Sequence, residues 1–134
     1  MKKALIVLVL AFLALISNAE TMEFSIFAKA FGKEVGLGNH EFETPEASNG
    51  WIKANFSENL VTIYCDGKAS TYKLKKIITK NTSYNTYQYY YTAENYTSHK
   101  LCTIQILGQY GGYEYVVLYG HGTALKYCVK SSKH

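Results

Sequence analysis

Short runs of alternating hydrophobic and polar residues, separated by turn residues, cover most of the chain after residue 20. Such runs are typical of β-strands, and none of them shows a helical period of useful length. The pattern predicts eight strands, at residues 23–30, 51–56, 60–65, 70–79, 84–93, 100–107, 112–119 and 124–130. Asp66-Gly67 separates two of these runs, and this dipeptide is a strong signal for a tight β-hairpin.

Successive hairpins of this kind make an antiparallel meander, which must bury one face of its sheet. We therefore predict an all-β fold and prefer a small up-and-down barrel, with a two-sheet β-sandwich as the alternative. Residues 32–50 contain many Gly, Glu and Asn residues and the only proline, Pro45. This stretch shows no helical stripe, so it is expected to be a long loop.

Alternation assigns the faces of three strands. Three sets of residues are expected to face the core: Val61, Ile63 and Cys65; Cys102, Ile104 and Ile106; Leu125, Tyr127 and Val129. Lys126, Cys128 and Lys130 are expected to face the other way. If one disulfide forms, this parity pairs Cys65 with Cys102 and leaves Cys128 outside. The alternative is that all three cysteines remain thiols, and an odd count leaves at least one thiol in either case.

Tyrosine is concentrated in one strand, where alternation places Tyr87, Tyr89 and Tyr91 on one face and Tyr90 on the other. Tyrosine suits a ligand site because it offers an aromatic ring and a hydroxyl group. It also suits a plain strand wall, where its β-propensity is sufficient explanation. We take Tyr87, Tyr89 and Tyr91, together with Trp51, as candidate ligand-binding residues, with the packed wall as the alternative.

The N-terminus has the three parts of a secretory signal peptide at residues 1–19. Lys2 and Lys3 precede 13 apolar residues at 4–16, and the small residues Ser17 and Ala19 follow. A membrane-spanning helix needs about 20 apolar residues, so a stable anchor is not expected after cleavage. The sequence thus predicts a single exported domain at 20–134, either periplasmic or secreted.

Charge gives little support for a nucleic-acid partner. Removal of Lys2 and Lys3 lowers the net charge from +4 to +2, and all 14 basic residues are lysine. Arginine is the usual bidentate reader of phosphate and guanine, and the chain has none. The spacing of cysteine and histidine fits no zinc site, so neither a metal nor a nucleic acid is expected.

Catalytic motifs are also missing from the sequence. Asp66 is the only aspartate and belongs to the hairpin signal, and His121 lies between two turn glycines without a neighbouring partner. No nucleophile elbow, metalloprotease motif, P-loop or dinucleotide fingerprint occurs. We therefore expect a protein that is not an enzyme and needs no cofactor.

The signal peptide, the early strand with Trp51 and the meander together resemble the calycins, the superfamily that includes the lipocalins. Asn49-Gly50-Trp51 is similar to the Gly-x-Trp start of lipocalins without its spacer, and the arginine that packs on that tryptophan is missing. Tyr64-Cys65 and Cys128 also resemble positions in small periplasmic lysozyme inhibitors, although their inhibitory loop motif is missing. The composition is similar to that of exported proteins of Bacteroidetes.

Two functions follow from this reading. The first is a non-enzymatic binding module that holds an apolar or aromatic small ligand in the barrel mouth, as the calycin resemblance implies. The second is an exported interaction protein, such as a lysozyme or protease inhibitor, that acts through a loop or an outer face. A cavity above about 300 Å³ with aromatic walls would favour the first. A filled barrel with a protruding 32–50 loop would favour the second.

Overall fold

The computed structural model describes residues 21–36 and 38–131, and the signal peptide expected at residues 1–19 lies outside the described residues. Nine strands make up the described part: β1 (Thr21–Gly36), β2 (Asn39–Phe42), β3 (Glu46–Asn55), β4 (Leu60–Cys65), β5 (Lys68–Thr82), β6 (Thr86–Asn95), β7 (Leu101–Gln109), β8 (Glu114–Tyr119) and β9 (Thr123–Ser131). In this part of the chain no helix is long and apolar enough to cross a membrane.

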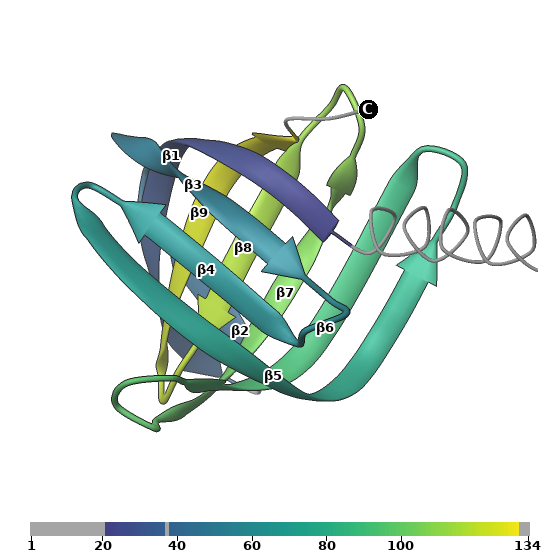
Figure 1. The fold of residues 1–134 in the computed structure, drawn as a ribbon. Helices are drawn as coiled ribbons and strands as arrows, with labels where there is room; N and C mark the ends of the chain where they lie inside the picture. The colour runs from purple at the N-terminus through teal and green to yellow at the C-terminus, as the bar shows by residue number, and fades with distance from the viewer. Residues whose placement is uncertain (1–20, 37, 132–134) are drawn as a thin grey trace, which may run out of the picture.

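The strands form one antiparallel sheet that closes on itself (Figure 1). Strands β3 to β9 follow one another in chain order, and β1 pairs with both β3 and β9. Eight strands thus make a closed up-and-down barrel, with the short β2 added at the edge of β1. This confirms the predicted barrel and replaces the sandwich alternative.

The Asp66-Gly67 hairpin forms where the sequence predicts it. Cys65 pairs with Lys68, so the connection has two residues. Both have positive φ angles, 51° at Asp66 and 85° at Gly67, as the tightest hairpin turns require. The Asp66 carboxylate accepts bonds from Lys29 Nζ at 2.7 Å and from the Asn49 amide at 3.2 Å. The turn is thereby tied to β1 and β3.

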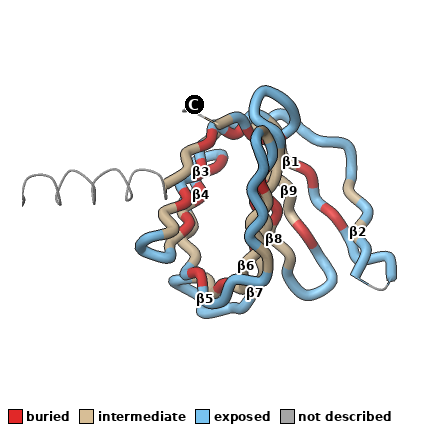
Figure 2. The backbone as a smooth tube through the Cα atoms, turned by 90° about the vertical axis from the view of Figure 1, so that its right-hand side faces the viewer, coloured by how far each residue is buried: buried red, intermediate tan, exposed pale blue. Residues whose placement is uncertain are grey.

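The barrel interior is filled by the alternate residues that the sequence predicts to face inward. The most deeply buried large side chains are Phe24, Ile52, Val61, Ile104, Ile106, Val116 and Val129. Buried positions recur along strands all around the barrel (Figure 2). Cys102 and Leu125 pack against this core while remaining partly exposed. The three core-facing sets from the alternation are thus confirmed.

The expectation of a loop at 32–50 is wrong. Strand β1 continues to Gly36, β2 occupies Asn39–Phe42, and β3 already begins at Glu46. The second half of β1 pairs with β9 on one edge and with β2 on the other, so its backbone is bonded on both sides. Its polar side chains are tolerated because they are exposed. Together, the second half of β1 and β2 form an arm beside the barrel, here called the β1–β2 arm (Figure 2).

Strands β5 and β6 extend beyond their neighbours. β4 pairs only with residues 68–73 of β5, whereas β5 pairs with β6 as far as Thr82. The hairpin therefore projects from the barrel (Figure 1). Register shifts at Leu74/Lys76 and at Ile77/Thr79 bend it, as β-bulges do.

Candidate functional site

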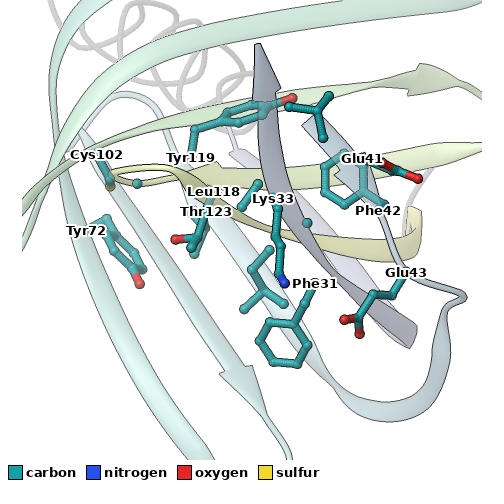
Figure 3. Close-up of a pocket in the computed structure, with 15 residues that line it drawn as sticks. Phe31, Lys33, Glu41, Phe42, Glu43, Tyr72, Cys102, Leu118, Tyr119 and Thr123 are labelled. Carbon is teal, nitrogen blue, oxygen red and sulfur yellow. The ribbon is translucent and has the colours of Figure 1, made fainter. Parts of the chain in front are cut away.

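A cavity of about 760 Å³ lies at the end of the barrel near the β8–β9 turn and the β1–β2 arm (Figure 3). We call it the mouth pocket. Its walls come from β1, β2, β5, β7, β8 and β9, so residues distant in sequence meet there. The volume falls within the range of about 300 to 1,000 Å³ that is usual for small-molecule sites.

The floor of the mouth pocket is apolar and continuous with the core. Tyr72, Cys102, Leu118 and Leu125 line it and also pack against the buried cluster. Leu118 pairs directly with Leu125 across β8 and β9, so their side chains lie together on the inner face. This floor follows from strict alternation on strands that the sequence predicts.

The remaining wall depends on a bulge in β1. The register with β9 shifts between Ile26 and Ala28. Beyond the shift, Phe31 pairs with Leu125 and Lys33 with Thr123, so both residues face the mouth pocket (Figure 3). The Phe31 side chain is 54% exposed, which leaves an aromatic ring accessible above an apolar floor.

The β1–β2 pairing holds Phe42 at the edge of the pocket. Phe42 lies opposite Gly32, and a Cβ atom at Gly32 would come within 2.7 Å of the Phe42 ring. Glycine at this position therefore leaves room for the Phe42 ring to lie against the backbone of β1. We infer that a side chain at Gly32 would displace Phe42 and change the shape of the pocket.

Among the described residues that line the mouth pocket, the charged ones are all exposed and lie at the rim. Lys33, Glu41 and Glu43 line the pocket, and Lys33 lies opposite Glu41 in the strand pair. No ion pair formed among the described residues includes any of these three side chains. The rim can therefore offer both an ammonium and carboxylates to the polar end of a bound molecule.

The titratable groups on the floor are held neutral. Burial raises the pKa of the Tyr72 hydroxyl above its usual 10.0, and burial also raises the pKa of the Cys102 thiol above 9.0. The thiolate is the nucleophilic form of cysteine, so at neutral pH Cys102 contributes a small apolar surface. The described residues contain no group of three metal-ligating side chains.

The side chains of Tyr87, Tyr89 and Tyr91 face the barrel interior, but away from the mouth pocket. Tyr87 pairs with Gly108 beside the β7–β8 turn, whereas the mouth pocket lies at the β8–β9 turn. The Tyr87 hydroxyl donates a bond of 2.6 Å to the buried Glu114 carboxylate. Tyr89 and Tyr91 stack against Phe56, with ring centroids 4.9 and 5.8 Å apart. These rings meet a packed aromatic cluster outside the mouth pocket.

Trp51 lies on the outer face of the barrel, away from the mouth pocket. Its ring stacks on Tyr64, its direct partner across β3 and β4, with centroids 5.8 Å apart and planes inclined by 18°. The Trp51 side chain is 46% exposed. The structure thus brings none of the four candidate ligand-binding residues into the mouth pocket.

All three cysteines are free thiols in this structure. Cys65 and Cys102 both belong to the inner face, as alternation predicts, and their pairing stays a prediction. Cys128 lies on the outer face opposite Tyr115 and Ala28 and is nevertheless buried.

Sequence reasoning missed the mouth pocket because six of its fifteen lining residues lie in the predicted loop at 32–50. The available signal was the period-two spacing of Phe31, Lys33 and Val35, which Gly32 within the run and Gly36 at its end obscured. Comparison of the chain with protein-family models, with curated proteins and with solved structures gave no match.

Proposed function

We propose that this protein is an exported, non-enzymatic binding module that holds a small ligand in the mouth pocket. The observation that carries the proposal is the open cavity of about 760 Å³, whose apolar floor joins the core and whose charges are confined to the rim. Small-molecule sites typically combine apolar walls with a few polar groups that fix orientation.

The lining indicates the class of ligand. Phe31, Leu118 and Leu125 offer apolar contact to an aliphatic or aromatic body. The opening of the pocket is lined by charged side chains, namely Lys33, Glu41 and Glu43. A polar end of the ligand would therefore remain hydrated at the rim. We therefore propose an amphipathic molecule that inserts its apolar end first.

The neutral fluorescent probe N-phenyl-1-naphthylamine tests this proposal. We expect it to bind the folded protein, and we expect Phe31→Glu to weaken binding about tenfold or more, because the new carboxylate would be desolvated by the probe. Phe27→Glu is the matched control. Phe27 is 51% exposed, on the same strand, and does not line the mouth pocket. Equal affinity of the two variants, or no binding by the parent protein, would refute the proposal.

Native mass spectrometry of protein purified from its source adds an independent test. A stoichiometric small molecule that is lost in the Phe31→Glu variant would support the mouth pocket as its site. A stoichiometric hydrolase and no small molecule would support the second candidate function. The mass of the purified chain would also show whether it begins at residue 20, as the proposed export requires.

The second candidate is an interaction protein that acts through the projecting β5–β6 hairpin. Ile77 and Ile78 on this hairpin are 45% and 53% exposed, and Tyr84 at its tip is fully exposed. Such exposed apolar side chains are typical of partner surfaces. Lysozyme and protease assays at stoichiometric protein test this candidate. Inhibition that Tyr84→Ala removes and Phe31→Glu leaves intact would favour it over the ligand carrier.

A further inference from the structure

A second hollow, of about 530 Å³, lies on the outside of the barrel over β8, β9 and the first half of β1. We call it the outer groove. Its floor is made of small residues, because Ala28 pairs directly with Cys128 across β1 and β9. The neighbouring position on β8 is Tyr115, which pairs with Cys128 from the other side.

Aromatic side chains form both walls of the outer groove. Tyr113 and Tyr115 line one side, with parallel rings whose centroids are 6.4 Å apart. Phe27 and Pro45 line the opposite side. Phe27 is the extra residue of the β1 bulge, and β-bulges commonly redirect a side chain in this way. The groove is therefore a slot between side-chain rings above a floor of small side chains.

Two lysines flank the floor on the same face of β9. Lys126 and Lys130 lie two residues before and after Cys128, so alternation places all three side chains on the outer face. Lys126 Nζ lies 4.6 Å from the centroid of the Phe42 ring and 5.0 Å from that of Tyr115. Lys130 Nζ lies 6.0 Å from that of Phe27. The rings hold both ammonium groups beside the groove.

In the part of the chain that the structure describes, the outer groove offers these lysines no free carboxylate. Among the described residues that line it, Glu114 alone is acidic, and Glu114 is only 4% exposed. Its oxygens accept bonds from the Tyr87 hydroxyl and from the amide and hydroxyl of Ser131. None of the ion pairs within residues 21–36 and 38–131 includes Lys126 or Lys130. The groove thus combines aromatic walls with a net positive charge.

We propose that the outer groove is a second binding site, separate from the mouth pocket, for an amphipathic anion with a flat apolar body. The body would lie between the Tyr113–Tyr115 wall and Phe27, over Ala28 and Cys128. Its carboxylate, sulfonate or phosphate group would take Lys130 or Lys126 as its counter-ion. Ring-held ammonium groups have less conformational freedom to lose on binding, which favours an anion at this position.

Two related probes separate the outer groove from the mouth pocket. The anionic dye 8-anilinonaphthalene-1-sulfonate is N-phenyl-1-naphthylamine with an added sulfonate group, so the two probes share one apolar body and differ by that anionic group. We expect the Lys126→Gln/Lys130→Gln double variant to bind the sulfonate dye about tenfold more weakly, because it loses a charge-assisted contact. The neutral probe should bind that variant as it binds the parent. Added salt should weaken binding of the sulfonate dye and leave binding of the neutral probe unchanged.

Amide chemical shifts locate each dye on the folded protein. We expect the sulfonate dye to shift the amides of Ala28 and Cys128, and the neutral probe to shift those of Leu118 and Leu125. Phe27→Glu should remove the first set of shifts and Phe31→Glu the second. The proposal is overturned if the double lysine variant binds the sulfonate dye within about twofold of the parent. It is also overturned if the shifts caused by that dye map to the mouth pocket. Neither outcome depends on whether the neutral probe binds.

Discussion

Phe27 and Phe31 are four residues apart on β1, yet they lie on opposite faces of the barrel wall. Phe31 lines the mouth pocket opposite Leu125, whereas Phe27 lines the outer groove beside Cys128. Residues four apart in a regular strand share a face. The register shift between Ile26 and Ala28 breaks that rule. One bulge therefore gives the barrel two different aromatic hollows.

The hydrogen bonds to Glu114 are expected to stabilise the end of the barrel opposite the mouth pocket. Tyr87→Phe should lower the free energy of unfolding by about 1 to 2 kcal/mol, because it removes one bond to a buried carboxylate. Glu114→Ala should cost about 3 kcal/mol, because the buried Tyr87 hydroxyl then loses its acceptor. Urea unfolding measures both changes. Glu58→Ala, in an exposed turn, is the control, and equal stability of all three variants would contradict the prediction.

Acid is expected to weaken the contact between β1 and the β4–β5 turn. The hydrogen bond from Lys29 is the main cause that holds the pKa of Asp66 below its usual 3.8. A carboxyl group whose pKa is lower in the folded protein than in the unfolded chain stabilises the folded protein. This stabilisation is fully present when the pH is above the unfolded-state pKa, and it is lost as the pH falls through the folded-state pKa. The stability advantage of the parent over Asp66→Asn should therefore disappear at pH values below 3.8.

Urea midpoints of the parent and of Asp66→Asn, measured from pH 7 to pH 2, check this prediction. Asparagine tolerates the positive φ angle at this position, so the substitution removes the charge and keeps the turn. A stability difference that stays constant over the whole range would contradict an origin in the carboxylate.

Gly67 is expected to contribute to the stability of the fold through its backbone conformation alone. Its φ angle is +85°, and a Cβ atom added there would meet no atom within 4 Å. Gly67→Ala should thus lower the free energy of unfolding by about 1 kcal/mol, the usual cost of placing a side chain in the left-handed region. Gly112→Ala is the matched turn control, since it has ordinary contacts beginning at 3.4 Å. Thermal unfolding compares the two, and an equal cost would contradict the backbone explanation.

Strands that pair with the strands before and after them in the sequence could be predicted closely. Leu60–Cys65 is predicted residue for residue as β4, because its alternation is strict and the Asp66-Gly67 turn marks its end. Residues 84–93 and 100–107 overlap β6 and β7 with small shifts at the ends. In these strands one buried face determines the alternation of hydrophobic and polar residues. The local sequence is therefore sufficient to predict the strand.

The second half of β1 could not be predicted in the same way. Its strand character comes largely from β9, a partner distant in the sequence, since Phe31 and Lys33 pair with β9 and only the short β2 pairs with Lys33 on the other edge. Glycine and charged residues have low strand propensity, and tertiary pairing overrides that preference here. The mouth pocket and the outer groove both depend on β1 and its bulge. The alternation of hydrophobic and polar residues alone therefore could not predict either site.

Phe56 is expected to cover the inner aromatic side chains at the point where β5 extends beyond its pairing with β4. Its ring stacks on Tyr89 and Tyr91, and burial raises the pKa of Tyr89 above 10.0. Phe56→Ala should lower the free energy of unfolding by about 2 to 3 kcal/mol and expose Tyr89 to water, so that the pKa of its hydroxyl falls toward 10.0. Urea unfolding and an NMR titration of the tyrosine ring carbons measure these two effects. Phe56→Leu should be more stable than Phe56→Ala, because leucine still covers the neighbouring side chains with an apolar group although it lacks a ring. If Phe56→Ala left the Tyr89 titration unchanged, the burial of Tyr89 would have to come from the strands around it.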